Sequence, residues 1–275
     1  MDSFYAVYLI IAVASIFSVM GSLFILIIYV KYPNLQCFAF RLVVYLSLFN
    51  FFESSSQLIP SYKIDPKMCL YQSMLNQFFG LCNILWTGFI CLILYFQICE
   101  IQSNFVRNEK LYLLLTLLIS SISIIIPVSF SSFGYVGGNC WIKEHELGNL
   151  FRFVFFFIPA WTVIALITII YIKIIRTVQR ESLLITEMTI SSNRVISKLK
   201  MYPIVMIVGF LPLTVYRIFE VFIDPPIWLY AASIGFYTCI GFMNAVVYGL
   251  NEAVKDEVFK TYLKQDVCIS MEDES

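Results

Sequence analysis

Charged side chains are scarce in this 275-residue sequence: only 13% of the residues are Asp, Glu, Lys or Arg. Six runs contain none of these residue types, namely residues 3–30, 68–99, 111–142, 153–172, 201–216 and 225–251. A seventh run, residues 42–62, is interrupted only by Glu53. A helix needs about 20 mostly apolar residues to cross the hydrocarbon core, and a soluble core helix rarely runs so long without a charge. The scarcity of charge therefore excludes an ordinary soluble domain and predicts a polytopic membrane protein.

Histidine, and cysteine at metal-binding spacing, are also scarce. His145 is the single histidine, and the eight cysteines form no Cys-x-x-Cys pair. We therefore expect no metal site, no cofactor and no enzyme activity, and no nucleic-acid partner. Residues 225–251 contain no lysine. A light-responsive protein with a retinal Schiff base in this last run is thereby excluded.

Hydrophobic residues make up 60% of the chain and aromatic residues 17%, which fits a lipid-embedded bundle. Together with the long uncharged runs, this composition predicts an all-α fold. We expect a seven-transmembrane helix bundle with a short amphipathic eighth helix, forming one domain over residues 1–264. The expected spans are about residues 4–30, 41–61, 70–99, 111–131, 149–173, 201–222 and 227–249. The amphipathic helix is expected at about 251–264, on the inner leaflet. Residues 265–275 would be a cytoplasmic tail, in which Cys268 is a candidate for palmitoylation that the sequence does not decide.

Basic residues are sorted between the two sides of this predicted bundle. Three lie in connections on one side: Lys63, Lys67 and Lys143. Thirteen lie on the other: Lys31, Arg41, Arg107, Lys110, Lys173, Arg176, Arg180, Arg194, Lys198, Lys200, Lys255, Lys260 and Lys264. The positive-inside rule places the richer side and the C-terminus in the cytoplasm and the N-terminus outside. A cleaved signal peptide is the alternative for the first run, but Asp2 stands where basic residues are usual and the run is too long.

Two cysteines fall on the outer side in this topology. Cys69 lies at the mouth of the third expected span, and Cys140 lies in the connection between the fourth and fifth. A disulfide between them would fasten this connection over the bundle and contribute about 4 kcal/mol in the chain-entropy model. The alternative is that both are free thiols.

Polar residues recur at helical spacing in three of the expected spans. They are Asn50, Glu53, Ser54 and Gln57; then Gln72, Asn76, Gly80, Asn83 and Thr87; then Tyr237, Gly241, Asn244, Tyr248 and Asn251. Polar groups in hydrocarbon must face one another or water, so the three stripes share an interior. They either only hold the helices together or form a hydrated cavity with a conformational network. Glu53 is the sharpest candidate, because a carboxylate midway along a span is costly unless it is protonated or paired.

Three further features point to parts that move or bind. Pro212 lies in the middle of the sixth span and is expected to bend it. Arg217 and Glu220, one turn apart at its outer end, either pair with each other or reach a ligand. Residues 176–200 form the longest basic connection, which would meet anionic lipid headgroups or a cytoplasmic partner.

Six runs in this order resemble the cyclic-AMP-receptor-like (class E) G-protein-coupled receptors. They are FRLVVYLSL (40–48), FFGLCNILWTGFICL (78–92), NCWI (139–142), FFFIPAW (155–161), YPIVMIVGFLPLTVYRIFE (202–220) and GFMNAVVYGLNE (241–252). Each run is weak alone, but the six occur in family order and are distributed along most of the chain. The resemblance implies a receptor that binds an extracellular ligand in the outer half of the bundle. It would activate a heterotrimeric G protein from the plasma membrane, with membrane lipids around it.

Site residues are expected at three levels of the bundle. The candidates for the ligand pocket are Gln72, Asn76, Glu53, Gln57, Arg152, Arg217 and Glu220. The expected activation network is Asn50, Asn83, Pro212, Asn244, Tyr248 and Asn251. The expected surface for the G protein is Arg176, Arg180, Lys198 and Lys200.

By the resemblance, Cys69 and Cys140 form the extracellular disulfide, and Asn244-x-x-x-Tyr248 is similar to the activation motif of larger receptor families. Two departures stand out. Asn50 occupies a position where an acidic residue is expected, and no arginine follows Cys99-Glu100-Ile101. The asparagine puts a sodium-type allosteric site in doubt. Without the arginine, an Asp-Arg-Tyr lock is absent. Cyclic AMP is not carried over as the ligand, because these motifs do not define the binding residues.

A multi-span transporter or channel is the alternative function. Transporters commonly contain internal repeats and paired broken helices, and this sequence shows neither. Ligand-evoked G-protein activation would distinguish the receptor from a transporter or channel.

Overall fold

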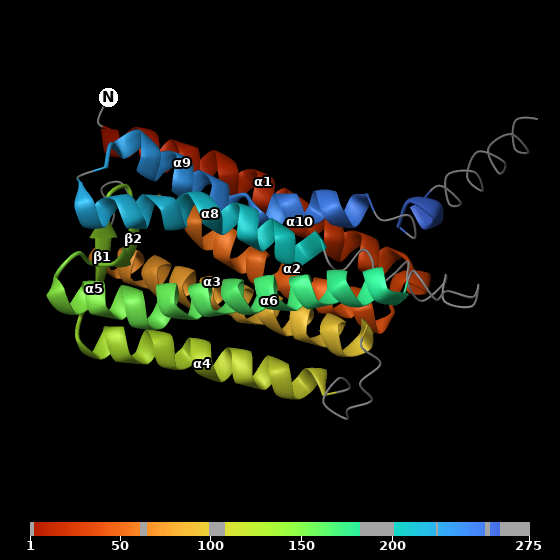
Figure 1. The fold of residues 1–275 in the computed structure, drawn as a ribbon. Coiled ribbons are helices and arrows are strands. Elements are labelled where there is room, and N and C mark those ends of the chain that lie inside the picture. The colour runs from red at the N-terminus through yellow and green to blue at the C-terminus, as the bar shows by residue number, and fades with distance from the viewer. Residues whose placement is uncertain are drawn as a thin grey trace, which may run out of the picture.

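Seven helical rods run side by side in the computed structural model, which describes residues 3–60, 65–98, 108–181, 201–223, 225–250 and 254–258 (Figure 1). The first four are single helices: α1 (Ser3–Lys31), α2 (Phe38–Gln57), α3 (Pro66–Ile98) and α4 (Glu109–Ser129). The fifth joins α5 (Glu146–Arg152), the π-helical segment η2 (Phe153–Phe157) and α6 (Ile158–Glu181). The sixth is α8 (Met201–Phe222), and the seventh joins α9 (Ile227–Thr238) to α10 (Ile240–Gly249). A short 3-10 turn, η1 (Pro33–Leu35), connects α1 to α2.

The membrane-spanning character differs among the rods. In the described chain, five are long and apolar enough to cross a membrane, and α9 with α10 adds a sixth that is bent by 40°. The remaining rod, α2, is more polar because it carries Asn50, Glu53 and Gln57, all of them buried. Polar side chains that face the interior leave the outer surface of a span free for lipid. The predicted all-α bundle of seven spans is confirmed.

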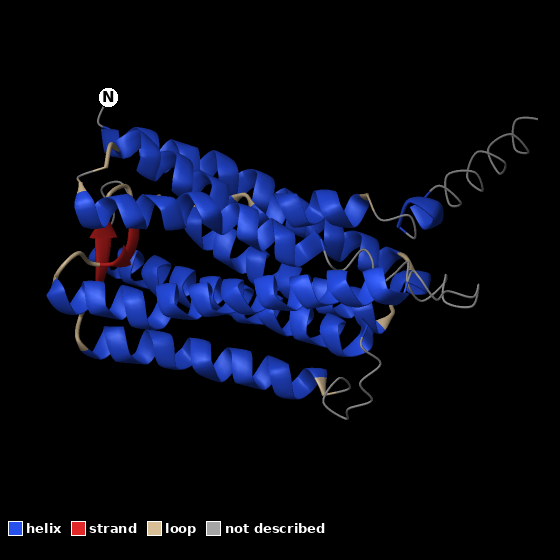
Figure 2. Ribbon diagram, viewed as in Figure 1, coloured by secondary structure: helices blue, strands red, loops and turns tan. Residues whose placement is uncertain are grey.

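A β-hairpin covers the end of the bundle at which α1 begins (Figure 2). Strands β1 (Phe133–Val136) and β2 (Asn139–Ile142) pair antiparallel around a turn at Gly137 and Gly138. Both glycines have positive φ, which a two-residue hairpin turn favours. A Cβ at Gly138 would lie 2.8 Å from the carbonyl oxygen of Phe4, so the turn packs directly on α1. The helical patterning of the sequence did not predict this hairpin.

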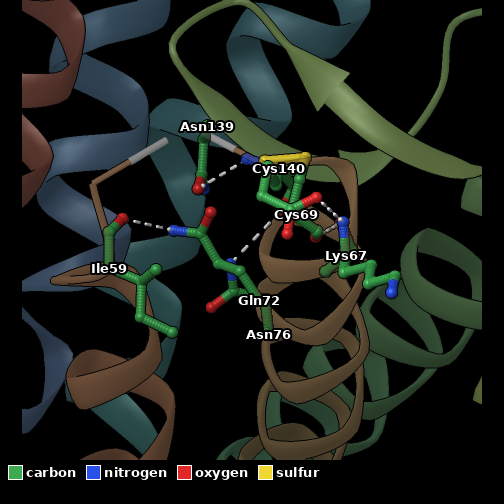
Figure 3. The surroundings of a disulfide bond; sticks show 9 residues. Ile59, Lys67, Cys69, Gln72, Asn76, Asn139 and Cys140 are labelled. Atoms are coloured by element: carbon green, nitrogen blue, oxygen red, sulfur yellow. Dashed lines mark hydrogen bonds between the residues drawn. A yellow bond between two sulfur atoms is a disulfide. The ribbon is translucent and has the colours of Figure 1, made fainter. Parts of the chain in front are cut away.

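A disulfide between Cys69 on α3 and Cys140 on β2 fastens the hairpin to the bundle, as predicted. Figure 3 shows the bonds beneath it. The Asn76 side chain donates to the Cys140 carbonyl at 3.4 Å, and Gln72 donates to the Ile59 carbonyl at 3.1 Å. The hairpin is therefore held at its middle by a covalent bond and at its tip by α1.

Some predicted segments lie wholly or partly outside the described residues. Of the amphipathic helix expected at 251–264, only residues 254–258 are described, and these are helical. The predicted tail, residues 265–275 with Cys268, lies outside.

Candidate functional site

An outer cavity of about 40 Å³ lies beneath the hairpin, among α2, α3, η2, α8 and α9. A single water molecule needs about 10–15 Å³ of cavity volume measured in this way. The outer cavity therefore has room for a few water molecules. Its lining residues are Glu53, Gln57, Asn76, Val136, Asn139, Trp141, Phe156, Phe157, Leu213, Arg217, Tyr230, Ile234 and Tyr237. Aromatic rings supply most of one wall, and polar side chains of α2 and α3 supply another.

Glu53 is at the inner end of this cavity and is held by two neighbouring helices. Asn83 of α3 donates to its Oε2, and the Tyr237 hydroxyl of α9 donates to its Oε1 at 2.5 Å. A Cβ at Gly80 would approach the Tyr237 hydroxyl to 2.9 Å and Glu53 Oε1 to 3.1 Å, so the glycine leaves space for this bond. Among the described residues, no lysine or arginine pairs with Glu53. We call Glu53, Asn83 and Tyr237 the carboxylate cluster.

Gln57 extends the polar contacts to α1. Its Oε1 accepts from Thr238 of α9 at 2.9 Å and from Ser15 of α1 at 3.2 Å. The residue before it on α2, Ser56, donates its hydroxyl to Asn76 Oδ1 of α3 at 2.6 Å. Side chains of α2 therefore connect α1, α3 and α9 at the level of the outer cavity.

The roof of the cavity is positioned by hydrogen bonds from the hairpin. Trp141 Nε1 donates to Gln77 of α3 at 2.9 Å, and its ring packs edge-on against Phe156 at 5.2 Å. Gln77 in turn donates to the Phe155 carbonyl at 3.1 Å. That carbonyl lies within η2, and π-helical segments of this kind are frequent at functional sites. Trp141 and Phe156 are thereby fixed against each other over the cavity.

Two arginines lie near the outer end, with different roles. Arg217 lines the cavity, stacks 5.1 Å from the Phe157 ring centroid and pairs with Glu220. Its Nε is buried and has no hydrogen-bond partner in the described structure. Arg152 does not line the cavity: it donates to the Ile142 carbonyl, pairs with Glu144 at 3.1 Å and stacks on Trp141. Arg152 therefore supports the hairpin.

A smaller inner cavity, of about 20 Å³, lies on the cytoplasmic side of the carboxylate cluster. It shares Glu53, Gln57 and Tyr237 with the outer cavity. Asn50, Ser54, Asn83 and Thr87 add polar groups to its wall, and Met206, Phe210 and Ile240 add apolar ones. Asn83 Oδ1 is buried without a partner in the described residues. The carboxylate cluster is thus the boundary between two polar cavities.

The structure separates the predicted pocket residues into two groups. Glu53, Gln57, Asn76 and Arg217 line the outer cavity. Gln72, Arg152 and Glu220 do not: they bond to a backbone carbonyl, to the hairpin and to Arg217, respectively.

Most residues of the expected activation network lie deeper in the bundle than the outer cavity, whereas Pro212 lies at the level of that cavity, next to Leu213. Asn50 and Asn83 line the inner cavity, and the Pro212 carbonyl accepts from Ser233 at 3.1 Å. Asn244 and Tyr248 are buried on α10, and Tyr248 packs edge-on against Phe40 at 5.4 Å. Asn251 lies outside the described residues.

Of the residues expected to face a G protein, Arg176 is exposed on α6. The Arg180 side chain, Lys198 and Lys200 lie outside the described part of the chain.

The aromatic walls were not predicted as part of the site. Trp141, Phe156 and Phe157 occur in the NCWI and FFFIPAW runs, which were noted only for their resemblance. Tyr237 belongs to a polar stripe, but its bond to Glu53 links residues 184 positions apart. Helical spacing within one span gives no such pairing between spans.

Comparisons with known proteins agree on one family. The family model described as "Slime mold cyclic AMP receptor" matches residues 1–264. "G-protein coupled receptor 1" of Arabidopsis thaliana is 26% identical over 256 residues, which are 88% of this chain and 77% of that protein. "Cyclic AMP receptor-like protein A" of Dictyostelium discoideum is 26% identical over 265 residues, or 93% of this chain and 68% of that protein.

The fold is similar to that of squid rhodopsin in its crystal structure, with a TM-score of 0.73 and 16% identity. The match covers 98% of this chain and 88% of the rhodopsin chain.

Proposed function

This chain is a G-protein-coupled receptor of the slime mold cyclic AMP receptor family, and from that premise we propose that its extracellular ligand binds in the outer cavity and acts on the carboxylate cluster. In the conformation described, the cavity has room for only a few waters. Binding of a larger ligand therefore requires the outer ends of the lining helices to separate. Such a ligand favours the more open arrangement of the bundle over the closed one.

The observation that carries the proposal is the position of Glu53, which lines both cavities. Its bonds to Asn83 and Tyr237 join α2 to α3 and α9. A ligand that displaces the Tyr237 hydroxyl, or moves α9, removes a donor from a buried carboxylate. The helices then rearrange until Glu53 regains a hydrogen-bond partner, because a buried polar group without one is costly. This is the differential contact that a population shift requires.

The chemistry of the cavity favours a ligand with a flat apolar part and an acceptor group. Trp141, Phe156 and Phe157 supply ring surfaces, and Arg217 offers an Nε–H without a partner in the described structure. Cyclic AMP is the first ligand to test, since the family description and one relative's name contain it.

The cytoplasmic partner that we propose is a heterotrimeric G protein, bound at the inner end of the bundle. Arg176 is exposed there on α6, and Arg180, Lys198 and Lys200 are proposed to extend the same basic surface. The host membrane is proposed to be the plasma membrane, where an extracellular ligand reaches the hairpin end.

The test is a G-protein dissociation sensor in cells that express the chain, exposed in turn to cyclic AMP, other nucleotides, peptides and lipids. We expect one ligand class to evoke dissociation. Glu53→Gln is expected to reduce the maximal response several-fold at a surface expression close to that of the parent. Glu146→Gln, at an exposed carboxylate of α5, is the matched control and is expected to respond normally.

An unchanged response in Glu53→Gln would contradict the coupling role of the carboxylate cluster. Ligand-evoked solute flux without any G-protein response would contradict G-protein coupling itself.

A further inference from the structure

Gln77 of α3 connects the roof of the outer cavity to its aromatic wall. The side chain is fully buried and does not itself line the cavity. Its Oε1 accepts from the Trp141 indole at 2.9 Å, and its Nε2 donates to the Phe155 carbonyl at 3.1 Å. One side-chain amide therefore joins three parts of the fold, namely α3, the hairpin and η2.

Pro159 explains why the Phe155 carbonyl is available to Gln77. In an α-helix this carbonyl would accept from the N–H of residue 159, but that residue is a proline and has no N–H. The bonds of η2 instead reach one residue further, as from the N–H of Ile158 to the Phe153 carbonyl. A backbone carbonyl within a membrane needs a donor from the protein. The proline thus leaves an acceptor on the fifth rod, and Gln77 of a neighbouring helix supplies its donor.

The two partners determine which side chain can serve at position 77. An indole N–H only donates and a backbone carbonyl only accepts, so the group between them must both accept and donate. Glutamine provides both functions on one planar amide. An apolar side chain provides neither, and an ionised glutamate provides only the acceptor.

The bonds of Gln77 set the positions of two rings that face the cavity. Trp141 packs edge-on against Phe156 with ring centroids 5.2 Å apart, and Phe156 follows Phe155 directly in the chain. The Phe156 ring also packs edge-on against the Tyr237 ring at 6.1 Å. The ring that Gln77 positions through the backbone is therefore in contact with both the roof and the carboxylate cluster.

We propose that Gln77 is a positioning residue of the ligand site, which holds the roof and the aromatic wall in one arrangement before a ligand binds. This inference rests on the proposed function, in which the ligand occupies the outer cavity. A site whose rings are already fixed loses less conformational entropy when a ligand binds. Loss of the Gln77 amide therefore weakens binding, although it removes no group that lines the cavity.

The first measurement needs no ligand. It is hydrogen–deuterium exchange of the full chain in detergent, with Gln77→Met as a variant of similar shape that can form neither bond. We expect exchange up to about tenfold faster in the hairpin, residues 133–142, and in residues 153–160, as for the loss of about one hydrogen bond in each. Trp141→Phe removes only the indole donor, so it should accelerate exchange in the hairpin alone.

Pro159→Ala tests the origin of the acceptor, because alanine restores the missing N–H. In this background Gln77→Met should still accelerate exchange in the hairpin, but no longer in residues 153–160. If Gln77→Met does not fold, Gln77→Asn takes its place. Its amide is too short to reach both partners, so a smaller increase in the same two segments is expected.

Gln72→Met is the matched control. Gln72 is also buried on α3 and donates to a backbone carbonyl, but this carbonyl belongs to Ile59, which is not part of the cavity. Exchange in both segments should remain at the parent rate. Three results would overturn the proposal: parent-like exchange in Gln77→Met, an equal increase in Gln72→Met, or an undiminished effect on residues 153–160 in the Pro159→Ala background.

The second measurement uses the G-protein dissociation sensor with cyclic AMP as the probe. Gln77→Met is expected to raise the half-maximal concentration about tenfold and to leave the maximal response unchanged, whereas Glu53→Gln lowers the maximal response. Gln72→Met should change neither quantity. An unchanged half-maximal concentration alongside faster exchange would overturn the positioning role and leave the receptor function in place. Absence of any response in the parent would contradict cyclic AMP as the ligand, and the exchange rates would still decide whether Gln77 holds the roof to the wall.

Discussion

At the scale of single residues, Glu53 connects more than two spans of the bundle through its hydrogen bonds. Its carboxylate is buried between α2, α3 and α9, where only Asn83 and Tyr237 donate to its oxygens among the described residues. A buried group of this kind that loses a hydrogen-bond partner pays its full desolvation cost. Glu53 therefore holds three spans together, and the same contacts make it sensitive to any shift of α9.

Tyr237→Phe removes one of these donors without changing the packing of the ring. We expect the free energy of unfolding to fall by about 1–3 kcal/mol, because a buried acceptor loses its partner. Thermal unfolding of the purified protein in detergent measures the change. Tyr71→Phe, at an exposed tyrosine of α3, is the control and should leave the unfolding temperature unchanged. In the double variant Tyr237→Phe with Asn83→Leu, the decrease in the free energy of unfolding should differ from the sum of the two single decreases. The reason is that both residues contact the same carboxyl group of Glu53.

Trp141 and Arg152 show how residues outside the helical stripes enter the site. Arg152 holds the Ile142 carbonyl and stacks 5.1 Å from the Trp141 ring centroid. The tryptophan in turn forms part of the cavity roof. A residue that the sequence suggests as a ligand contact thus supports the neighbour that lines the cavity.

At the scale of elements, α1 and α10 pack closely through small residues. A Cβ at Gly21 would lie 2.9 Å from the Ala245 Cβ and 3.0 Å from the Phe242 Cα. Close approach through glycine and serine is a common way to pack helices in membranes. The contact fixes the inner half of the seventh rod, while its outer half, α9, follows a different direction beyond the bend.

Gly21→Ala is therefore expected to destabilise the protein by about 1–3 kcal/mol, because the added methyl group forces the two helices apart. Gly249→Ala is the matched control: its Cβ would meet Phe24 at 3.6 Å, an ordinary contact. Alanine also favours a helix by up to about 1 kcal/mol over glycine, so the control is expected to be neutral or slightly stabilising. Thermal unfolding of both variants makes the comparison. Equal behaviour of the two would show that α1 and α10 are not in close contact.

At the scale of the whole molecule, the hairpin and its disulfide close the outer end of the bundle. The bridge joins residues 71 positions apart, from the outer end of α3 to β2. Trp141, Asn139 and Val136 of the hairpin all line the outer cavity. The shape of the cavity therefore depends on where this one covalent bond holds the hairpin.

Cys69→Ser and Cys140→Ser should each remove this constraint to the same extent. We expect each substitution to lower the free energy of unfolding by about 4 kcal/mol, the chain-entropy value for a loop of this length. Each should also reduce surface expression to the same extent. The double variant should be no worse than either single variant. Cys37→Ser, at an exposed free thiol, is the control. Unequal single variants, or a double variant that is clearly worse, would mean that the two cysteines act separately.

The spans could be predicted because each one must be long and apolar enough, by its own sequence, to cross the hydrocarbon core. The uncharged runs and the sorting of Lys and Arg lie within single segments or connections, so no knowledge of neighbours is needed. The polar stripe of Asn50, Glu53 and Gln57 likewise shows which side of α2 faces inward. Residues of this stripe do line the cavities.

By itself, the sequence of this protein determined the seven helices, their polar faces and the pair of cysteines on one side, since these follow from periodicity and charge along the chain. Only the tertiary structure decided which polar groups meet: Tyr237 with Glu53, Gln57 with Ser15 and Thr238, and Arg152 with the hairpin. It also decided where cavities remain, because a cavity depends on how helices cross and bend. Helical spacing defines the face of one helix, but the partner of that face depends on the rotation and depth of every other helix in the bundle.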